Sequence, residues 1–340
     1  MVVLKQALPR MGLGMAALGR PGYINLDRGS VFDTDTTNTS DVRRRSEEMM
    51  QNQANIVMET MMKESKRRNM LPWFDCARSY GLSEKFVGEF LRKNNVKPDE
   101  VYVSSKWGYT YVADFCVELE DGEPHEVKDH SLDNFLKQME ETKTFLGEYL
   151  DLYQVHSATF ESGILTDTRV HEAMSQCRKD YGWKIGLSVS SPAQGDILRE
   201  AMEITTAKGT RLFDSVQCTF NVFEQSPLDA LLEAHNAGMD IIIKEGMANG
   251  RILKNKNILD LSRQTKYPPD VLGLAAILCQ DFQPRVLSGA VTPEQLISNL
   301  NALDLSEKMK NDDKDLLEEI MTYKLESETY WQERSNLVWN

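Results

Sequence analysis

Short apolar runs rich in β-branched residues alternate along this chain with longer amphipathic stretches. Short runs bounded by turn-forming residues indicate buried strands, whereas a 3.6-residue repeat indicates helices that cover one face. The pattern predicts strands at residues 13–18, 71–75, 101–106, 151–156, 184–190, 214–219, 240–244 and 285–289. It predicts helices near residues 41–69, 83–94, 131–147, 169–180, 194–207, 226–238, 269–281 and 293–303. Such alternation is typical of a parallel sheet with crossover helices.

The eight strand–helix units follow one another without a break in composition. They favour an α/β fold that consists of a single (β/α)8 TIM barrel. An open doubly wound sheet would leave exposed edges, which closure removes. The length of 340 residues agrees with a barrel, because single α/β barrels run to about 250 residues or more. Residues 306–340 form a polar, helix-like tail that ends in apolar residues near Trp339, and we expect it to pack back on the barrel.

Local residue signals predict where two helices begin, and one segment matches a dinucleotide-binding motif. Ser226-Pro227 and Thr292-Pro293 each set a capping hydroxyl before a first-turn proline. Residues 12–17 match the G-x-G-x-x-A dinucleotide fingerprint, but the following Gly-Arg-Pro-Gly at 19–22 cannot open the helix that would hold a pyrophosphate. The fingerprint is therefore set aside, and these glycines are expected to punctuate the first strand.

Composition and charge exclude several partners. The formal net charge is -13 and the pI is about 5.0, so the field of the protein repels a phosphate backbone and nucleic acid is not an expected partner. Neither a basic leader followed by an apolar stretch nor a run of about 18 apolar residues is present, so we expect a cytoplasmic protein without a membrane partner. Five cysteines without a Cys-x-x-Cys pair predict free thiols in a reducing compartment and no metal site.

Ionisable side chains end three successive predicted strands. These strands end in Asp75, Lys106 and His156, and Tyr80 lies in a loop just beyond the first of them. In a (β/α)8 barrel the carboxyl ends of the strands share one rim, and catalytic groups gather there. Each residue alone has a structural explanation, such as a cap or a buried histidine, but together they indicate a site. Later strands also end in polar residues, at Gln217 and Lys244-Glu245.

The order of these residues resembles the aldo-keto reductase superfamily. Residues 74–84 read Phe-Asp-Cys-Ala-Arg-Ser-Tyr-Gly-Leu-Ser-Glu, with Gly88 following, and are similar to the family pattern Asp-Thr-Ala…Tyr-Gly…Glu…Gly. Ser105-Lys106-Trp107, the run 151–156 and Ser215-Val216-Gln217 with Asn221 then follow in the family's order. The resemblance implies one barrel domain over residues 1–340, with a core at about 10–305 and a C-terminal tail at 306–340.

The resemblance implies an oxidoreductase that uses NADP or NAD to interconvert a small-molecule aldehyde, ketone or sugar aldose and the corresponding alcohol or lactone. It implies a catalytic tetrad of Asp75, Tyr80, Lys106 and His156, with Tyr80 as general acid and base. A phenol with the ordinary pKa of about 10 is a poor proton donor at neutral pH. We expect Lys106, held by Asp75, to lower the pKa of Tyr80, and His156 to orient the carbonyl oxygen.

The same resemblance implies a cofactor site with two departures from the family. Its residues would be Ser188, Gln217, Lys244, Gly246, Gly289, Thr292, Gln295 and Asn299. Val189 follows Ser188 where relatives usually carry asparagine. Lys244-Glu245 stands where an aromatic residue normally stacks on the nicotinamide, so a different packing of that ring is expected.

The preference for NADP over NAD is expected to be weak. Gly289 and Gln295 stand where NADP-preferring members place basic residues, so a 2′-phosphate would lose its usual partners. A substitute charge from Arg251, Lys254 or Lys256, just after the seventh strand, is the alternative. We therefore predict that both cofactors are used, or that any NADP preference comes from that basic stretch.

A long aromatic connection at residues 107–130 follows the third strand. Unstructured loops of this length are usually functional, so Trp107 and Tyr109 are candidate substrate-binding residues. An aromatic cluster that only seals the barrel mouth is the alternative. Two other functions stay open at this point: a regulatory protein that binds a nicotinamide cofactor on the same barrel, and a cofactor-free lyase or isomerase that uses Lys106 and His156 for proton transfer.

Overall fold

Eight parallel strands close into a barrel in the order β1-β10-β9-β8-β7-β6-β3-β2. The structure is a computed structural model that describes residues 8–24, 45–117, 119–120 and 122–339. The barrel strands are β1 (Met11–Gly14), β2 (Trp73–Asp75), β3 (Tyr102–Trp107), β6 (Leu150–Ala158), β7 (Lys184–Val189), β8 (Ser215–Thr219), β9 (Asp240–Lys244) and β10 (Arg285–Ser288). The predicted (β/α)8 TIM barrel is confirmed.

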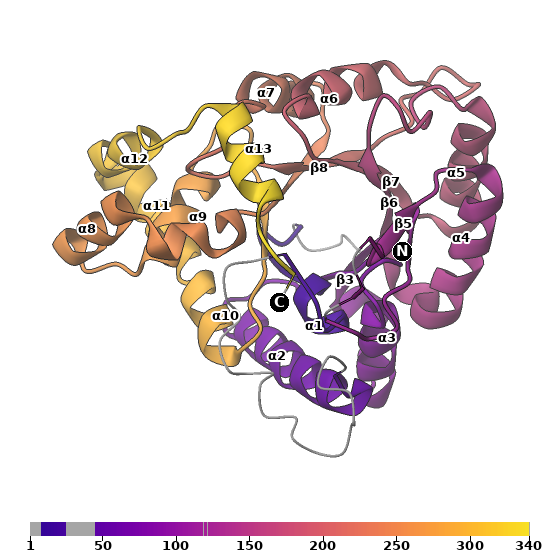
Figure 1. The fold of residues 1–340 in the computed structure, drawn as a ribbon, viewed down its shortest axis with the longest axis horizontal. Coiled ribbons are helices and arrows are strands. Elements are labelled where there is room, and N and C mark those ends of the chain that lie inside the picture. Colours follow the sequence, from indigo (N-terminus) through magenta and orange to yellow (C-terminus); the bar gives the residue numbers. More distant parts are fainter. Residues whose placement is uncertain (1–7, 25–44, 118, 121, 340) are drawn as a thin grey trace.

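Helices ring the barrel, as Figure 1 shows. Those predicted from the sequence are α2 (Glu47–Arg67), α3 (Ser83–Lys93), α4 (Leu132–Leu146), α5 (Thr168–Tyr181), α6 (Gln194–Glu203), α7 (Leu228–Asn236), α9 (Pro269–Leu278) and α10 (Pro293–Leu300). The others are α1 (Ala16–Gly19), α8 (Lys256–Thr265), α11 (Ala302–Asp312), α12 (Lys314–Met321) and α13 (Ser327–Ser335). Residues 41–44, where the first long helix was expected to begin, lie outside the described residues.

Side-chain caps explain where several helices begin. Thr292 Oγ1 accepts a hydrogen bond from Gln295 N at 3.2 Å, as predicted for α10. The predicted cap at Ser226 is wrong, because the Ser226 hydroxyl donates to Glu224 and Pro227 occupies the cap position of α7. A serine hydroxyl can satisfy only a few partners, and here the neighbouring carboxylate outcompetes the helix backbone.

The first strand lies earlier in the chain than the predicted span 13–18. Strand β1 ends at Gly14, and Met15 N donates to Asp75 O at 2.9 Å. Gly12 is required by close approach to the next strand, because a Cβ there would lie 2.3 Å from the Trp73 ring. Helix α1 has only four residues, so the glycine-rich segment forms barrel wall and not a pyrophosphate site.

The inside of the barrel is packed with side chains. Trp73, Tyr102, Leu152, Ile242 and Leu287 form one buried cluster. The Arg285 guanidinium covers it, 4.1 Å from the Trp73 ring centroid and 4.4 Å from that of Tyr102. Because the interior is filled in this way, open space for a ligand lies at the carboxyl ends of the strands.

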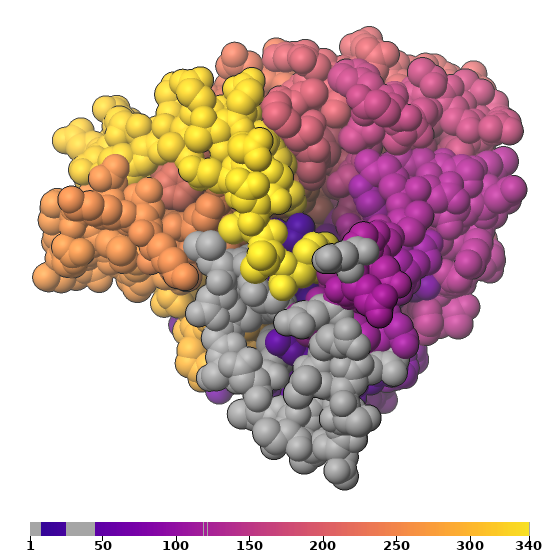
Figure 2. All heavy atoms as spheres, viewed as in Figure 1, coloured from indigo at the N-terminus to yellow at the C-terminus, as the bar shows by residue number. Residues whose placement is uncertain are grey.

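Two segments cover the carboxyl-end opening. In the connection after β3, β4 (Tyr109–Tyr111) pairs antiparallel with β5 (Glu126–Lys128). From the other side comes the C-terminal tail: Tyr330 of α13 accepts a hydrogen bond from Asn221 at 2.9 Å, and the Trp339 ring stacks on His125 at 4.1 Å. Figure 2 shows this tail, in yellow, lying across the centre of the face. The tail therefore bridges the opening.

All five cysteines are free thiols, as predicted. In the described part of the chain, helices are too short or too polar to span a bilayer.

Candidate active site

Asp75 and Lys106 form a buried ion pair at the carboxyl ends of β2 and β3. Lys106 Nζ lies 2.5 Å from Asp75 Oδ2 and donates to the Cys76 carbonyl at 2.8 Å. The other carboxylate oxygen, Asp75 Oδ1, accepts from Ser104 Oγ at 2.7 Å and from Gln217 Nε2 at 3.3 Å. Lys106 is 0% exposed and Asp75 is 1% exposed. Because hydrogen bonds satisfy both charges, the pair is held in one geometry.

The loop that carries Tyr80 is tied to the same rim. Arg78 N donates to the Lys106 carbonyl at 2.9 Å. Gly81 adopts a φ of +56°, which lets the chain turn sharply into α3. At Gly19 a Cβ would lie 2.3 Å from the Tyr80 carbonyl oxygen, so only glycine permits the close approach of the segment after β1. These contacts fix the position of Tyr80 from both sides.

The structure brings the four predicted tetrad residues together. The Tyr80 ring centroid lies 4.8 Å from Lys106 Nζ. The His156 ring, at the carboxyl end of β6, meets the Tyr80 ring edge-on at 5.4 Å. On the outer side the Arg20 guanidinium lies 5.2 Å from the Tyr80 centroid. Tyr80 is thus enclosed by two cations and an imidazole.

The pKa of Tyr80 moves opposite to the sequence expectation. Burial raises the pKa of Tyr80 well above 10, the Asp75 carboxylate raises it further, and the charge of Arg20 opposes both. The expected net lowering by Lys106 is not found, because Lys106 directs its ammonium group to Asp75 and to the Cys76 carbonyl. With its pKa raised, Tyr80 keeps its proton at neutral pH and can give it up only to a stronger base, such as a developing alkoxide.

His156 is a neutral imidazole. Burial lowers the pKa of His156 well below 6.5, and the charges of Lys106, Arg20 and Lys244 lower it further. Ser79 Oγ lies 3.2 Å from His156 Nδ1 and orients the ring. A neutral imidazole carries one N–H, so this side chain can donate one hydrogen bond to a carbonyl oxygen.

The two predicted substrate-binding aromatics have different positions. Tyr109, in β4, is half-buried, and its ring centroid lies 5.0 Å from that of His156. Trp107 is fully buried and packs 4.8 Å from Phe135, away from the cavity. The substrate-binding prediction for Trp107 is therefore wrong, since the side chain belongs to the core. The aromatic connection both seals the barrel and places one ring beside His156.

A cavity of about 500 Å³ opens beside the tetrad and extends to α10. Asp75, Tyr80 and Gln217 line one end. Of the expected cofactor residues, those that line it are Gln217, Lys244, Gly246, Gly289, Gln295 and Asn299. Ser188 is fully buried and accepts a hydrogen bond from Ser157 N at 2.8 Å, and Thr292 caps α10, so these two act behind the cavity wall.

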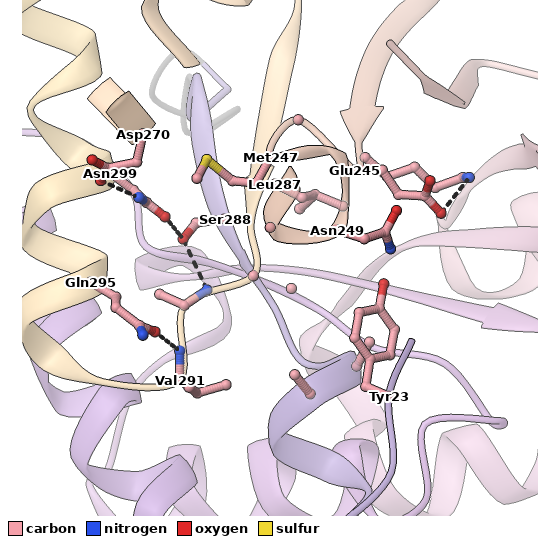
Figure 3. A pocket seen from close by; sticks show the side chains of 18 of the residues that line it. Tyr23, Glu245, Met247, Asn249, Asp270, Leu287, Ser288, Val291, Gln295 and Asn299 are labelled. Atoms are coloured by element: carbon pink, nitrogen blue, oxygen red, sulfur yellow. Dashed lines mark hydrogen bonds and ion pairs between the residues drawn. The ribbon is translucent and has the colours of Figure 1, made fainter. Parts of the chain in front are cut away.

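Hydrogen bonds order the α10 end of the cavity, as Figure 3 shows. Asn299 Nδ2 donates to Asp270 Oδ2 at 2.8 Å, and Asn299 Oδ1 accepts from Ser288 Oγ at 2.8 Å. Gln295 Oε1 accepts from Val291 N at 2.9 Å and so shapes the turn before α10. Two carboxylates, Asp270 and Glu294, line this end.

The basic stretch after β9 does not supply a charge to this end. Arg251 binds Glu333 at 3.0 Å and stacks 4.1 Å from the Tyr330 ring centroid, so it is held by α13. Lys254 and Lys256 are exposed and lie outside the cavity lining. The expected substitute for a phosphate-binding arginine is therefore not found at these three positions.

A second charged pair lies where β9 ends. Glu245 has a φ of +55°, and its carboxylate binds the Arg334 guanidinium of α13 at 2.5 and 2.8 Å. Burial alone raises the pKa of Glu245, but the charges of Arg334 and Lys244 outweigh it and lower the pKa to about 2. Burial lowers the pKa of Lys244 to about 8, against the opposing charge of Glu245.

The cavity fits a nicotinamide dinucleotide at both ends. Beside Tyr80, Gln217 Oε1 is buried without a hydrogen-bond partner, and a carboxamide N–H would satisfy it. At the other end the amino terminus of α10 presents the positive end of its dipole. The volume also lies in the range of about 300–1,000 Å³ that is typical of ligand pockets.

Sequence reasoning missed Arg20 and Arg334. Arg20 is 4% exposed, donates to the Ser79 carbonyl at 2.9 Å and binds Glu126 at 2.7 Å. It follows helix α1 and not strand β1, so the strand-end rule does not reach it. Arg334 reaches Glu245 from the tail, and no local pattern in the sequence signals that long-range contact.

The fold is thus a closed (β/α)8 barrel with these four side chains on its carboxyl-end rim. Residues 38–321 match the model of the Aldo/keto reductase family, and the chain belongs to this family. The recognised resemblance is thereby confirmed.

Solved structures support the fold. A candidate aldo-keto reductase from Pseudomonas aeruginosa has a TM-score of 0.61 and 19% identity, covering 89% of this chain and 93% of that chain. The holo form of an aldo-keto reductase from Bacillus halodurans has a TM-score of 0.61 and 18% identity, covering 90% and 91%. Among curated proteins, no sequence matches this chain.

Proposed function

We propose that this protein reduces a small aldehyde, ketone or aldose to the alcohol with NADPH or NADH, and that Tyr80 donates the proton. The observation that carries the proposal is the buried Tyr80, packed between Lys106 and His156 at the end of a cavity that fits a dinucleotide. When bound, the nicotinamide cofactor supplies the hydride that the carbonyl carbon accepts. Tyr80 then supplies the proton that the carbonyl oxygen needs, which balances the reduction.

The remaining tetrad residues prepare this proton transfer. His156 donates its N–H to the carbonyl oxygen and directs that oxygen toward the Tyr80 hydroxyl. Lys106 lies 4.8 Å from the Tyr80 ring centroid and stabilises negative charge as the proton leaves. Asp75 holds Lys106 in place through the 2.5 Å ion pair. Tyr109, 5.0 Å from His156, forms a wall for the carbonyl substrate.

The same geometry argues against the two alternatives. A cofactor-free lyase or isomerase needs a lysine that can act as base, but Lys106 is committed to Asp75 and the Cys76 carbonyl. A regulatory protein that only binds a cofactor needs no aligned Tyr80 and His156 beside the cavity. The tetrad therefore favours turnover.

We infer that both NADPH and NADH serve as the cofactor. Gln295 uses its amide oxygen to hold Val291 N, and Asp270 and Glu294 place negative charge at the same end of the cavity. A 2′-phosphate would meet these carboxylates without an arginine partner, so the usual preference for the phosphorylated cofactor is lost.

Substitution of Tyr80 tests the proposed function. Tyr80→Phe keeps the ring but removes the proton donor, so turnover of aldehydes and aldoses should fall on the order of 10²-fold or more while cofactor affinity persists. Oxidation of NADPH or NADH, followed by absorbance, gives the rate, and fluorescence titration gives the affinity. Tyr111→Phe is the matched control. Tyr111 lies in β4, over the carboxyl-end opening of the barrel, but outside the tetrad. Near-parental turnover in Tyr80→Phe would reject the assigned acid.

A further inference from the structure

Lys244 places a cation in the cavity at the point where the reaction occurs. Its Nζ donates to Ser190 Oγ at 2.6 Å and to Thr219 Oγ1 at 2.7 Å, and both partners are neutral hydroxyls. Lys244 lines the cavity together with Tyr80 and Gln217. A hydride acceptor whose oxygen receives the Tyr80 proton must lie beside Tyr80, so the reacting ring occupies this same end.

The nearby carboxylates do not neutralise this cation. Glu245 Oε1 is 3.9 Å from Lys244 Nζ, beyond hydrogen-bond distance. Its two oxygens already bind Arg334 at 2.5, 2.8 and 3.0 Å. Asp75 is likewise bound by Lys106. Arg20, beside Tyr80, is paired with Glu126. Four cations therefore face three carboxylates around this end of the cavity, and the cluster carries a net positive charge.

We propose that Lys244 makes the cavity bind the reduced nicotinamide cofactor in preference to the oxidised one. The inference rests on the proposed function. An oxidised nicotinamide ring carries one positive charge and a reduced ring carries none. Inside a poorly solvated cavity, a second cation near Lys244 raises the free energy of the oxidised complex only.

The pH dependence of cofactor affinity shows whether the charge of Lys244 sets the difference between the oxidised and reduced cofactors. The titratable and charged groups that face Lys244 are Glu245, Arg334, Cys218, Lys106 and His156. Lys244 has a pKa of about 8, whereas those of Glu245 and Cys218 are about 2 and about 12. As pH rises through about 8, Lys244 loses its proton, so affinity for the oxidised cofactor should rise. Affinity for the reduced cofactor should stay nearly constant.

The experiment compares dissociation constants of NAD⁺ and NADH in the parent, Lys244→Met and Lys244→Arg. Titrations by calorimetry between about pH 6.5 and about pH 9.5 need no substrate turnover. In the parent at neutral pH, NADH should bind on the order of tenfold tighter than NAD⁺, and raising the pH should shrink that ratio. Lys244→Met, which keeps the length of the side chain, should shrink it at every pH. Lys244→Arg keeps a charge that does not titrate here, so its ratio should stay high throughout.

Each outcome bears on one claim. If Lys244→Met unfolds, which thermal melting would show, the parent pH series and Lys244→Arg still decide the question. If both cofactors bind but the ratio is independent of pH and of the charge at residue 244, the inference about Lys244 is overturned and the proposed function stands. If neither cofactor binds the parent, the proposed function itself fails.

Discussion

The ion pair between Glu245 and Arg334 should be a main contributor to the stability of the closed barrel mouth. Arg334→Met removes the guanidinium but keeps most of the apolar stem, so a buried carboxylate loses its closest cation. The side chain of Glu245 is 5% exposed, so water cannot replace the lost partner.

The pKa of Glu245 gives the expected size of the loss in free energy of unfolding. Lowering it from 4.5 to about 2 corresponds to about 3 kcal/mol in favour of the charged carboxylate. We expect Arg334→Met to reduce the free energy of unfolding by about that amount at neutral pH, in line with the cost of breaking other buried pairs. Because the folded-state pKa is depressed, this stabilisation is present above about pH 4.5 and is lost as the pH falls toward about 2.

Urea unfolding followed by tryptophan fluorescence at about pH 7 and about pH 3 measures both effects. Arg169→Met is the matched control, because Arg169 pairs with Asp167 on the surface with its side chain 73% exposed. Such an exposed pair should contribute less than about 1 kcal/mol. If Arg334→Met destabilises the protein no more than Arg169→Met does, the ion pair between Glu245 and Arg334 of α13 does not stabilise the fold.

Two further predictions concern cofactor choice and pH. Gln295→Arg should raise the ratio of kcat/KM for NADPH over NADH, because it adds a phosphate partner beside α10; a parental ratio already above about 10³ that the variant leaves unchanged would contradict the assignment of this end of the cavity. Because the pKa of His156 lies well below 6.5, kcat/KM should show no inflection near that pH. A pH profile with a step near about 6.5 that disappears in His156→Gln would show that the imidazole titrates there.

The barrel and the positions of Asp75, Lys106 and His156 on its rim follow from the sequence because both depend on short-range patterns. An apolar run buried on both sides predicts a parallel strand, and the residue that ends it must lie on the rim. Asp75, Lys106 and His156 are found by that rule alone. The first strand was misplaced because apolar Leu13–Leu18 also suits the short helix α1, and periodicity cannot separate the two over so few residues.

The remaining differences depend on contacts that a local pattern does not contain. Trp107 directly follows the rim residue Lys106, yet its ring packs against Phe135 of α4. The alternation of residues along β3 did not distinguish that orientation from one that faces the cavity. The Tyr80 pKa depends on burial and on where Lys106 directs its charge. Arg334 and Arg251 take their partners across the barrel mouth, between segments far apart in the chain.

The order in which the chain is synthesised gives the tail contact a further consequence. A ribosome adds about 5–20 residues per second, so Arg334 emerges several seconds after Glu245. Once β10 has emerged, every strand of the barrel is available, but the Glu245 carboxylate still lacks the cation that offsets its burial. A nascent barrel would therefore keep its mouth hydrated and loosely packed, and the cavity would reach its final charge balance only when α13 docks.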